Sequence, residues 1–149
     1  MEISHPRSFG LLRIAFGGVW AIDSFFKWQP AFQNNFVGYL TDAMPGQPAL
    51  VASWIQLWIN IVSVQPHLFA IAVALTETAI ALSLLTGLFA RPMIVIGALF
   101  SLVIWAVPEG FGGPYTAGAT DVGTALIYML VFLALWLGRS WEFYSVRKG

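Results

Sequence analysis

A carboxylate in the middle of an apolar run is the first feature of this sequence that could do chemistry. Glu77 stands near the centre of the run 68–89. A charged side chain in hydrocarbon costs about 2.5–3.5 kcal/mol on insertion scales, so we expect Glu77 to have a partner or a task. Two interpretations are open: a buried ion pair with Arg13 that fixes helix register, or a proton-handling acid beside a ligand pocket.

Polar residues also follow one face of the apolar run 9–26. They are separated by four, three, four and three positions, and they are Arg13, Gly17, Trp20, Ser24 and Lys27. This spacing places them on one stripe of a helix, facing protein rather than hydrocarbon. Asp23 precedes Lys27 by one helical turn, which is the favourable order for an ion pair. We therefore expect an Asp23–Lys27 pair, either as a simple salt bridge or as part of a site.

A third group of polar residues lies around the run 122–137. Asp121, Thr124 and Tyr128 lie broadly along one face of a helix that begins there. A capping role at the helix start would by itself explain Asp121. Other polar and aromatic residues are expected at the same outer level, and these are Lys27, Asp23, Trp28, Glu109 and Tyr115. Polar groups above an apolar slot would suit a ring that carries two carbonyl oxygens.

Composition excludes several classes of function. Hydrophobic residues occupy 58% of the 149 positions and charged residues only 9%, whereas a soluble domain has about a quarter charged residues. Seven basic and seven acidic residues cancel, so no basic field exists to bind nucleic acid. The chain has no cysteine, and His5 and His67 stand before separate runs, so we expect no haem, metal or iron–sulfur cluster.

The apolar runs predict an all-α membrane protein with one domain over residues 1–149. A helix that crosses a bilayer needs about 20 mainly apolar residues. Runs of this kind cover residues 9–26, 68–89, 92–107 and 122–137. The last two are short and depend on their flanks or on a thinner bilayer. We expect a bundle of four transmembrane helices, the last of them opened by Thr120 and Asp121.

The positions of lysine and arginine predict the orientation, because cytoplasmic flanks are enriched in both. With four spans, one side of the membrane receives Arg7, Arg91, Arg139, Arg147 and Lys148. The sequence therefore predicts a multi-pass protein of the cytoplasmic (inner) membrane, surrounded by lipid, with both termini in the cytoplasm.

One further apolar segment, 50–64, carries a polar stripe. Its polar residues recur every three or four positions and are Ser53, Gln56, Asn60 and Ser63. A helix of this kind lies in the membrane interface or lines the bundle, with Trp54 and Trp58 stacked one turn apart. A fifth span would move Arg91 to the outer side, so we expect an additional interfacial amphipathic helix on the outer side.

Several stretches of the chain resemble the DoxX superfamily, and in particular its DoxD-like proteins. The most specific likeness runs from Glu109 to Tyr128, through the segments 109–115, 118–124 and 127–128. The first helix is also similar, in the segments 13–17 and 23–28, as are Glu77, the segment 84–87 and Arg91. The type member of these proteins is the large membrane subunit of thiosulfate:quinone oxidoreductase. The resemblance covers nearly the whole chain.

This resemblance implies a membrane subunit of a quinone-linked oxidoreductase. Such a subunit, with a second protein subunit, passes electrons from an outer-face donor such as thiosulfate to membrane quinone. Under this hypothesis Lys27 binds a quinone oxygen or an anionic substrate, while Glu77 and Asp121 exchange protons. The residues expected around the quinone are Arg13, Trp20, Asp23, Tyr115, Thr124 and Tyr128.

Two other functions stay open at this stage. The chain could be an accessory or scaffold subunit of a larger respiratory or photosynthetic complex. Arg13, Glu77 and Asp121 would then be internal ties, and small residues such as Gly17 would permit close helix contact. A small-molecule or ion permease is a further option, since acids within the membrane also mark transport routes.

Overall fold

The computed structural model describes residues 6–146, and every regular element in this part of the chain is helical. The α-helices are α1 (Pro6–Lys27), α2 (Pro30–Asn34), α3 (Phe36–Thr41), α4 (Ala49–Val62), α5 (Pro66–Thr86), α6 (Ala90–Ala106) and α7 (Thr124–Leu137), and two 3₁₀ turns are η1 (Gly110–Gly112) and η2 (Ser140–Glu142). The predicted all-α class is thus confirmed for the described residues. His5, Arg147 and Lys148, which entered the sequence predictions, lie outside them.

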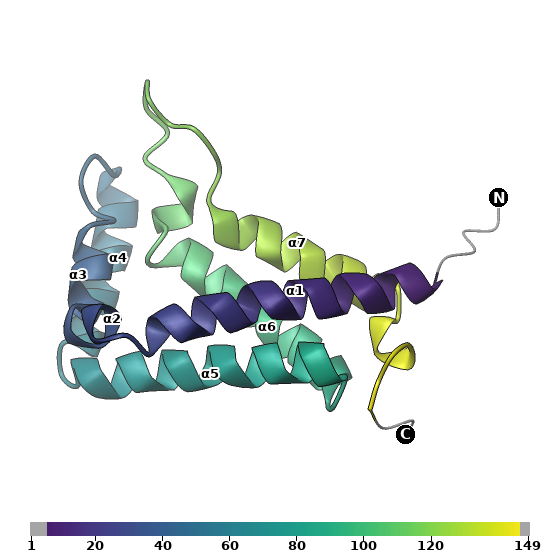
Figure 1. Ribbon diagram of the computed structural model, residues 1–149. Coiled ribbons are helices and arrows are strands. Elements are labelled where there is room, and N and C mark those ends of the chain that lie inside the picture. The colour runs from purple at the N-terminus through teal and green to yellow at the C-terminus, as the bar shows by residue number, and fades with distance from the viewer. Residues whose placement is uncertain (1–5, 147–149) are drawn as a thin grey trace.

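Four helices form the body of the molecule and three lie at one end (Figure 1). The helices α1, α5, α6 and α7 alternate in direction and correspond to the four predicted apolar runs, with ends that differ by at most three residues. The helices α1 and α5 pack side by side along their length, as do α6 and α7. The helices α3 and α4 run across the end where α1 stops and α5 starts.

The short helices α2 and α3 were not expected from the sequence. Pro30 occupies the first turn of α2, where its missing N–H costs nothing. The residues Phe32, Phe36 and Leu40 follow at intervals of four, and all three are buried. The rings of Phe32 and Phe36 meet edge to face with their centroids 5.6 Å apart. This aromatic contact joins the two helices, and the apolar cluster that also contains Ala70 and Val107 holds them against the end of the bundle.

The start of the last helix differs from the prediction that Thr120 and Asp121 would open it. The helix α7 begins at Thr124. The turn before it requires Gly123, whose φ is +93°. The carboxylate of Asp121 accepts a hydrogen bond from the Gly123 N–H at 2.8 Å, within the loop. The capping acid is instead Glu109, which accepts from the N–H of Ala125 at 3.0 and 3.2 Å.

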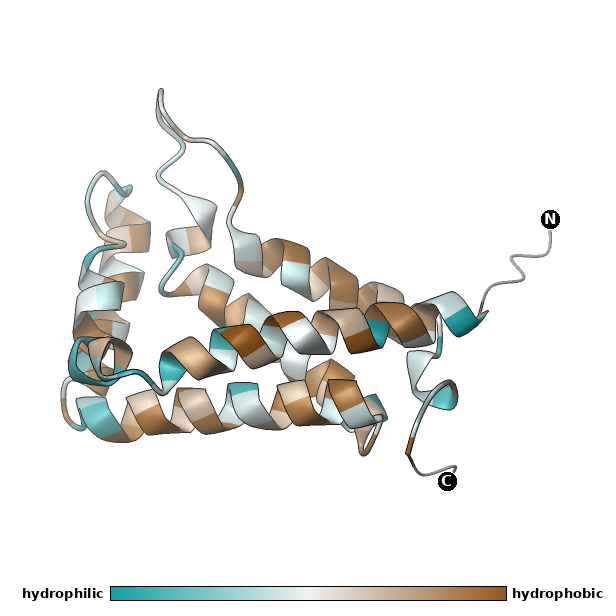
Figure 2. Cartoon of the chain, in the orientation of Figure 1, coloured by the Kyte–Doolittle hydropathy of each residue, from teal (hydrophilic) through white to brown (hydrophobic). Residues whose placement is uncertain are grey.

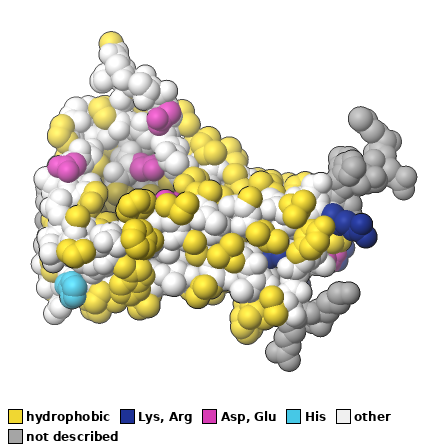
Figure 3. Space-filling view, viewed as in Figure 1, with side chains coloured by type: hydrophobic (Ala, Val, Ile, Leu, Met, Phe, Trp, Pro, Cys, Tyr) yellow, Lys and Arg dark blue, Asp and Glu magenta, His cyan; other side chains and the backbone are white. Residues whose placement is uncertain are grey.

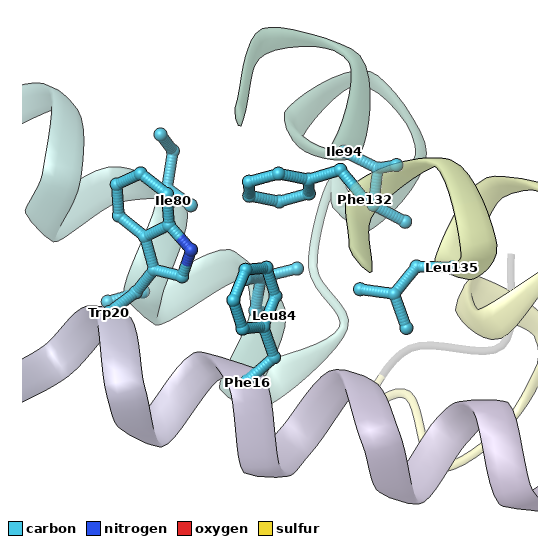
Figure 4. Packing of buried hydrophobic residues seen from close by; sticks show 8 residues of the cluster. Phe16, Trp20, Ile80, Leu84, Ile94, Phe132 and Leu135 are labelled. Carbon is cyan, nitrogen blue, oxygen red and sulfur yellow. The ribbon is translucent and has the colours of Figure 1, made fainter. Parts of the chain in front are cut away.

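The core lies where the four long helices meet. Figure 4 shows its side chains, which are Phe16, Trp20, Ile80, Leu84, Ile94, Phe132 and Leu135. Phe16 meets Phe132 edge to face with the ring centroids 5.0 Å apart. Because α1, α5, α6 and α7 all contribute, this cluster fixes the four helices relative to one another.

Between their ends these helices have a mainly apolar outer surface, while the charged residues Arg13 and Glu77 are buried. Figure 2 shows hydrophobic residues along the lengths of the long helices, with hydrophilic residues in the connections, at helix ends and at a few positions within α1 and α5. Exposed side chains include Leu11, Ile22, Phe25, Leu75, Leu82, Leu99 and Leu133, whereas Arg13 and Glu77 are buried. This distribution is the one expected where a surface faces hydrocarbon.

Two helical segments, Arg7–Lys27 and Pro66–Thr86, are long and apolar enough to cross a membrane. The apolar helices Ala49–Val62, Ala90–Ala106 and Thr124–Leu137 are shorter. Of the four predicted spans, two therefore have the full length of a transmembrane helix.

We expect Gly17→Leu to lower the free energy of unfolding in detergent by about 1–3 kcal/mol, because it overpacks a close helix contact. A Cβ atom at Gly17 would lie 2.9 Å from the backbone nitrogen of Leu85 and 3.0 Å from Cβ of Leu84. Thermal unfolding of the purified protein measures the change. The matched control is Gly18→Leu, where an added Cβ meets nothing within 4 Å. Equal losses in both variants would contradict the close packing of α1 on α5.

Candidate functional site

A cavity of about 820 Å³ opens at the end of the bundle that carries α3 and α4. Most of its wall is aromatic or aliphatic, and the aromatic residues include Phe26, Phe32, Phe36, Trp58, Phe69 and Phe100. The polar residues of the wall include Lys27, Gln29, Thr76, Glu77 and Glu109. Its size and its few polar groups are typical of a small-molecule site.

Charged side chains are distributed unevenly along the molecule. On the face drawn in Figure 3, acidic side chains gather around a hollow at the end with α3 and α4. Basic side chains lie toward the other end, where α1 begins. The cavity therefore lies at the end of the molecule that is richer in acids.

The ion pair of Lys27 and Glu77 is the main polar feature of the cavity. The Lys27 Nζ atom lies 3.5 Å from Oε2 of Glu77, and the two side chains are 26% and 2% exposed. Lys27 also lies over the ring of Phe32, 5.3 Å from its centroid. The Oε2 atom of Glu77 has no hydrogen-bond partner among the described residues. Within the wall of the cavity, Oε2 of Glu77 can therefore still accept a hydrogen bond.

Two ion pairs that the sequence suggested are absent from the described residues. Lys27 pairs with Glu77 and not with Asp23, whose carboxylate accepts a hydrogen bond from the Tyr128 hydroxyl at 3.1 Å. The ion pair between Arg13 and Glu77, one of the two interpretations of Glu77, does not form. Arg13 lies toward the N-terminal end of α1, whereas Glu77 is next to Lys27 at its C-terminal end.

Arg13 instead donates hydrogen bonds to backbone carbonyl groups. Its fully buried guanidinium donates to the carbonyl oxygens of Leu84, Phe143 and Tyr144, the last two at 2.9 and 3.1 Å. The Leu84 carbonyl is among the last four of α5, which have no partner within the helix. A cation is favourable at this negative end of the helix dipole. Arg13 therefore ties the end of α5 to the C-terminal segment.

Trp20 belongs to the core, Tyr128 packs against it, and Asp23 is half-buried beside Tyr128. Tyr128 contacts the rings of Phe16 and Trp20, with centroid separations of 5.3 and 5.7 Å. The Asp23–Tyr128 hydrogen bond links α1 to α7 one turn from Lys27. These residues support the wall that carries Lys27, and they do not line the cavity themselves.

The loop 107–123, the start of α7 and Trp28 do not bring their polar residues to the cavity, contrary to the expected convergence. Tyr115 is exposed and its hydroxyl donates to the Phe111 carbonyl at 2.6 Å. Asp121 and Thr124 are also exposed. Trp28 turns to Thr78, donating from Nε1 to the hydroxyl oxygen at 3.0 Å. None of these four side chains lines the cavity.

Glu109 is the acid that this loop does contribute to the cavity. It lines the wall and caps α7 through Ala125. Burial raises the pKa of the Glu109 carboxyl, the hydrogen bond from Ala125 lowers it, and the nearby charge of Asp121 raises it further, so that the net shift is upward.

Sequence reasoning missed the wall formed by α2 and α3 and left the position of Trp58 open. The aromatic residues Phe32, Phe36 and Tyr39 all line the cavity. The signal was present in Pro30 followed by large apolar residues at intervals of four, which is the spacing of one helix face.

Comparison of the chain with protein-family models, with curated proteins and with solved structures found no match. Within residues 6–146, no cluster of three or more His, Asp or Glu side chains is placed to hold a metal ion.

Proposed function

We propose that this chain is a membrane protein whose transmembrane helices are α1, α5, α6 and α7, and that its cavity binds a membrane quinone for an oxidoreductase. The observation that carries the proposal is the apolar cavity with the Lys27–Glu77 pair in its wall. A flat apolar ring with oxygen substituents needs both an apolar slot and a small number of polar groups.

The apolar outer surface and the charge distribution support the membrane assignment. Helices of 17 and 14 residues, the lengths of α6 and α7, are about 26 and 21 Å long. The hydrocarbon layer is about 30 Å thick, so these two helices would require local thinning. Arg7, Arg91 and Arg139 stand at helix ends on the same side of the alternating bundle. Following the positive-inside rule, we assign that side to the cytoplasm of an inner membrane.

The placement of α4 agrees with this topology. It runs across the end of the bundle opposite the three arginines, where α1 stops. A helix in this position would lie along the outer surface of the membrane with its exposed apolar residues, such as Leu50 and Leu57, toward lipid. The cavity would then open near the outer interface.

A bound quinone would accept two electrons and two protons. Lys27 would donate a hydrogen bond to one of its oxygens, protonated Glu77 would supply one of the two protons, and water at the open end of the cavity would supply the other. Deprotonated Glu77 is paired with Lys27, and when Glu77 takes up a proton the remaining charge is on Lys27, whose side chain is 26% exposed and so keeps contact with water.

The resemblance to DoxD-like proteins supports a role in electron transfer to quinone. Under this proposal a second protein subunit holds the electron donor site at the outer face, with thiosulfate as one candidate donor. The electrons would then reach the cavity from that subunit, since the sequence contains no cysteine for a disulfide or an iron–sulfur cluster.

A scaffold role is the second candidate function, and the contacts of Arg13 and Tyr128 favour it. Both residues were expected near a ligand, and both make hydrogen bonds between elements of the protein instead, Arg13 to Leu84 and Tyr128 to Asp23. Under this alternative the protein packs against a larger complex and performs no chemistry. Turnover of that complex would be unaltered when Glu77 is neutralised.

Quinone binding by the purified protein tests the proposal. A quinone with a short alkyl tail is titrated into the detergent-solubilised protein, and quenching of tryptophan fluorescence reports binding. We expect saturable binding that weakens about tenfold in Glu77→Gln, because the Lys27 ammonium that donates to the quinone oxygen is no longer held in place by a carboxylate.

The control is Asp121→Asn, which should bind as the wild type does because Asp121 is outside the cavity. Thermal unfolding of each variant shows that the fold is kept. Equal affinities of the wild type and Glu77→Gln would overturn the assignment of the site.

A further inference from the structure

We infer that Trp58 is a second polar anchor of the cavity and that the cavity selects rings with oxygen atoms at two positions. One oxygen would accept a hydrogen bond from the indole N–H of Trp58, and the other would bind the Lys27–Glu77 pair. This inference rests on the proposed function, because it specifies that the same cavity recognises two oxygen atoms of the ligand's ring.

Trp58 is a buried donor without an acceptor. It lies on α4 and lines the cavity, and its Nε1 atom has no hydrogen-bond partner among the described residues. Most buried polar atoms in proteins are hydrogen-bonded, and leaving one unpaired costs about 1–3 kcal/mol. An acceptor brought by a ligand would remove this cost.

Neighbouring contacts hold the indole of Trp58 in place. Its ring meets that of Trp54 nearly perpendicularly, with centroids 5.9 Å apart. Trp54 is itself fixed, since its Nε1 donates to the carbonyl of Ala106 at 2.9 Å. Trp58 also packs against the apolar cluster that contains Phe36 and Val62. Packing therefore fixes the position of the indole and of its unpaired N–H group.

Other tryptophans differ from Trp58 in this respect. The Nε1 atoms of Trp28 and Trp105 donate to Thr78 and to the Val122 carbonyl, at 3.0 and 2.8 Å. Trp20 also has an unpaired buried Nε1, but it belongs to the core and does not line the cavity. Among the described tryptophans, Trp58 alone combines an unpaired buried N–H with a place in the cavity wall.

A second unpaired group lies on a different wall of the same cavity. Oε2 of Glu77, on α5, lacks a hydrogen-bond partner, and Lys27 at the end of α1 approaches it to 3.5 Å. One wall thus offers a donor alone, while the other offers both a donor and an acceptor. A quinone oxygen and a quinol hydroxyl oxygen can each accept from Trp58, whereas Glu77 can accept only from the hydroxyl form.

Two ligands and one substitution test the inference. The first ligand is a benzoquinone with a short alkyl tail, and the second is a ring with the same tail and one ketone oxygen. For the wild type we expect the quinone to bind about tenfold more tightly than the mono-ketone, which is the value of one hydrogen bond. In Trp58→Phe this preference should fall to about twofold or less, because the donor for the second oxygen is gone.

The control variant is Trp141→Phe, which removes an indole at the far end of the molecule, where Trp141 packs on Trp136. It should keep the tenfold preference, with thermal unfolding confirming that both variants fold. A tenfold preference retained in Trp58→Phe would overturn the role of Trp58 while leaving the proposed function intact. If the wild type binds neither ligand, both the inference and the proposed function are overturned.

Discussion

Replacing Lys27 with methionine is expected to lower the free energy of unfolding by about 3–5 kcal/mol at neutral pH, which is the usual cost of removing one partner of a buried ion pair. The side chain of Glu77 is only 2% exposed, and Lys27 is the cation next to it at 3.5 Å. Without Lys27, Glu77 would either stay charged beside aromatic rings with no countercharge or take up a proton, and both cost free energy at neutral pH. Equilibrium unfolding in detergent, followed by circular dichroism, measures the loss.

The double variant Lys27→Met with Glu77→Gln provides the control. It removes both charges together, so we expect it to recover most of the lost stability while losing ligand binding. A double variant as unstable as Lys27→Met alone would show that the lysine acts through packing, for example on Phe32, and not through Glu77.

The second large effect is expected from Arg13→Met, which should also lower the free energy of unfolding by about 3–5 kcal/mol. Hydrogen bonds to a charged donor contribute about 1.5–3 kcal/mol each, and Arg13 donates to three carbonyls. A methionine has a similar length but no donor. The same unfolding measurement applies, with no change expected in quinone binding because Arg13 is not part of the cavity wall.

Two further variants separate charge from geometry at Arg13. Arg13→Lys keeps the charge but not the planar fork of donors, so its stability should lie between those of the wild type and Arg13→Met. Arg7→Met removes an exposed arginine from the same helix and should change stability by less than about 0.5 kcal/mol. A loss in Arg7→Met equal to that in Arg13→Met would contradict a specific role for the buried guanidinium.

The helices could be predicted from the sequence because apolar runs and their breaks are local signals. The run 68–89 became α5 (Pro66–Thr86), and the segment 50–64 became α4 (Ala49–Val62). The glycine at position 87, with φ of +78°, ends α5 three residues before the run of apolar residues suggests.

The partners of the buried charges could not be predicted, because spacing within one helix does not give its axial offset from another. The stripe through Arg13, Gly17 and Lys27 was expected to face protein, and all three residues contact other elements. Gly17, however, lies against Leu84 and Leu85, which sets the offset of α1 against α5. This offset carries Lys27 to Glu77 and leaves Arg13 at the end of α5.

The cavity itself was beyond sequence reasoning for a related reason. Its wall combines Phe32 and Phe36 from two short helices, Trp58 from a crossing helix and Glu77 from a long one. Periodicity shows which residues share a face, but the face that Trp58 presents to the cavity depends on how α4 crosses the bundle. That crossing is set by tertiary packing, including the Trp54 hydrogen bond to Ala106.

The hydrogen bonds of Arg13 to the C-terminal segment have a consequence for the order of events during synthesis. Two of its acceptors, Phe143 and Tyr144, follow it by 130 and 131 positions in the chain. Translation of the first helix is therefore complete long before these carbonyls leave the ribosome. Until they do, the guanidinium can donate only to the Leu84 carbonyl of α5, whose offset against α1 is already set by Gly17. The emergence of Phe143 and Tyr144 then completes the set of hydrogen bonds and stabilises a helix pairing that formed earlier.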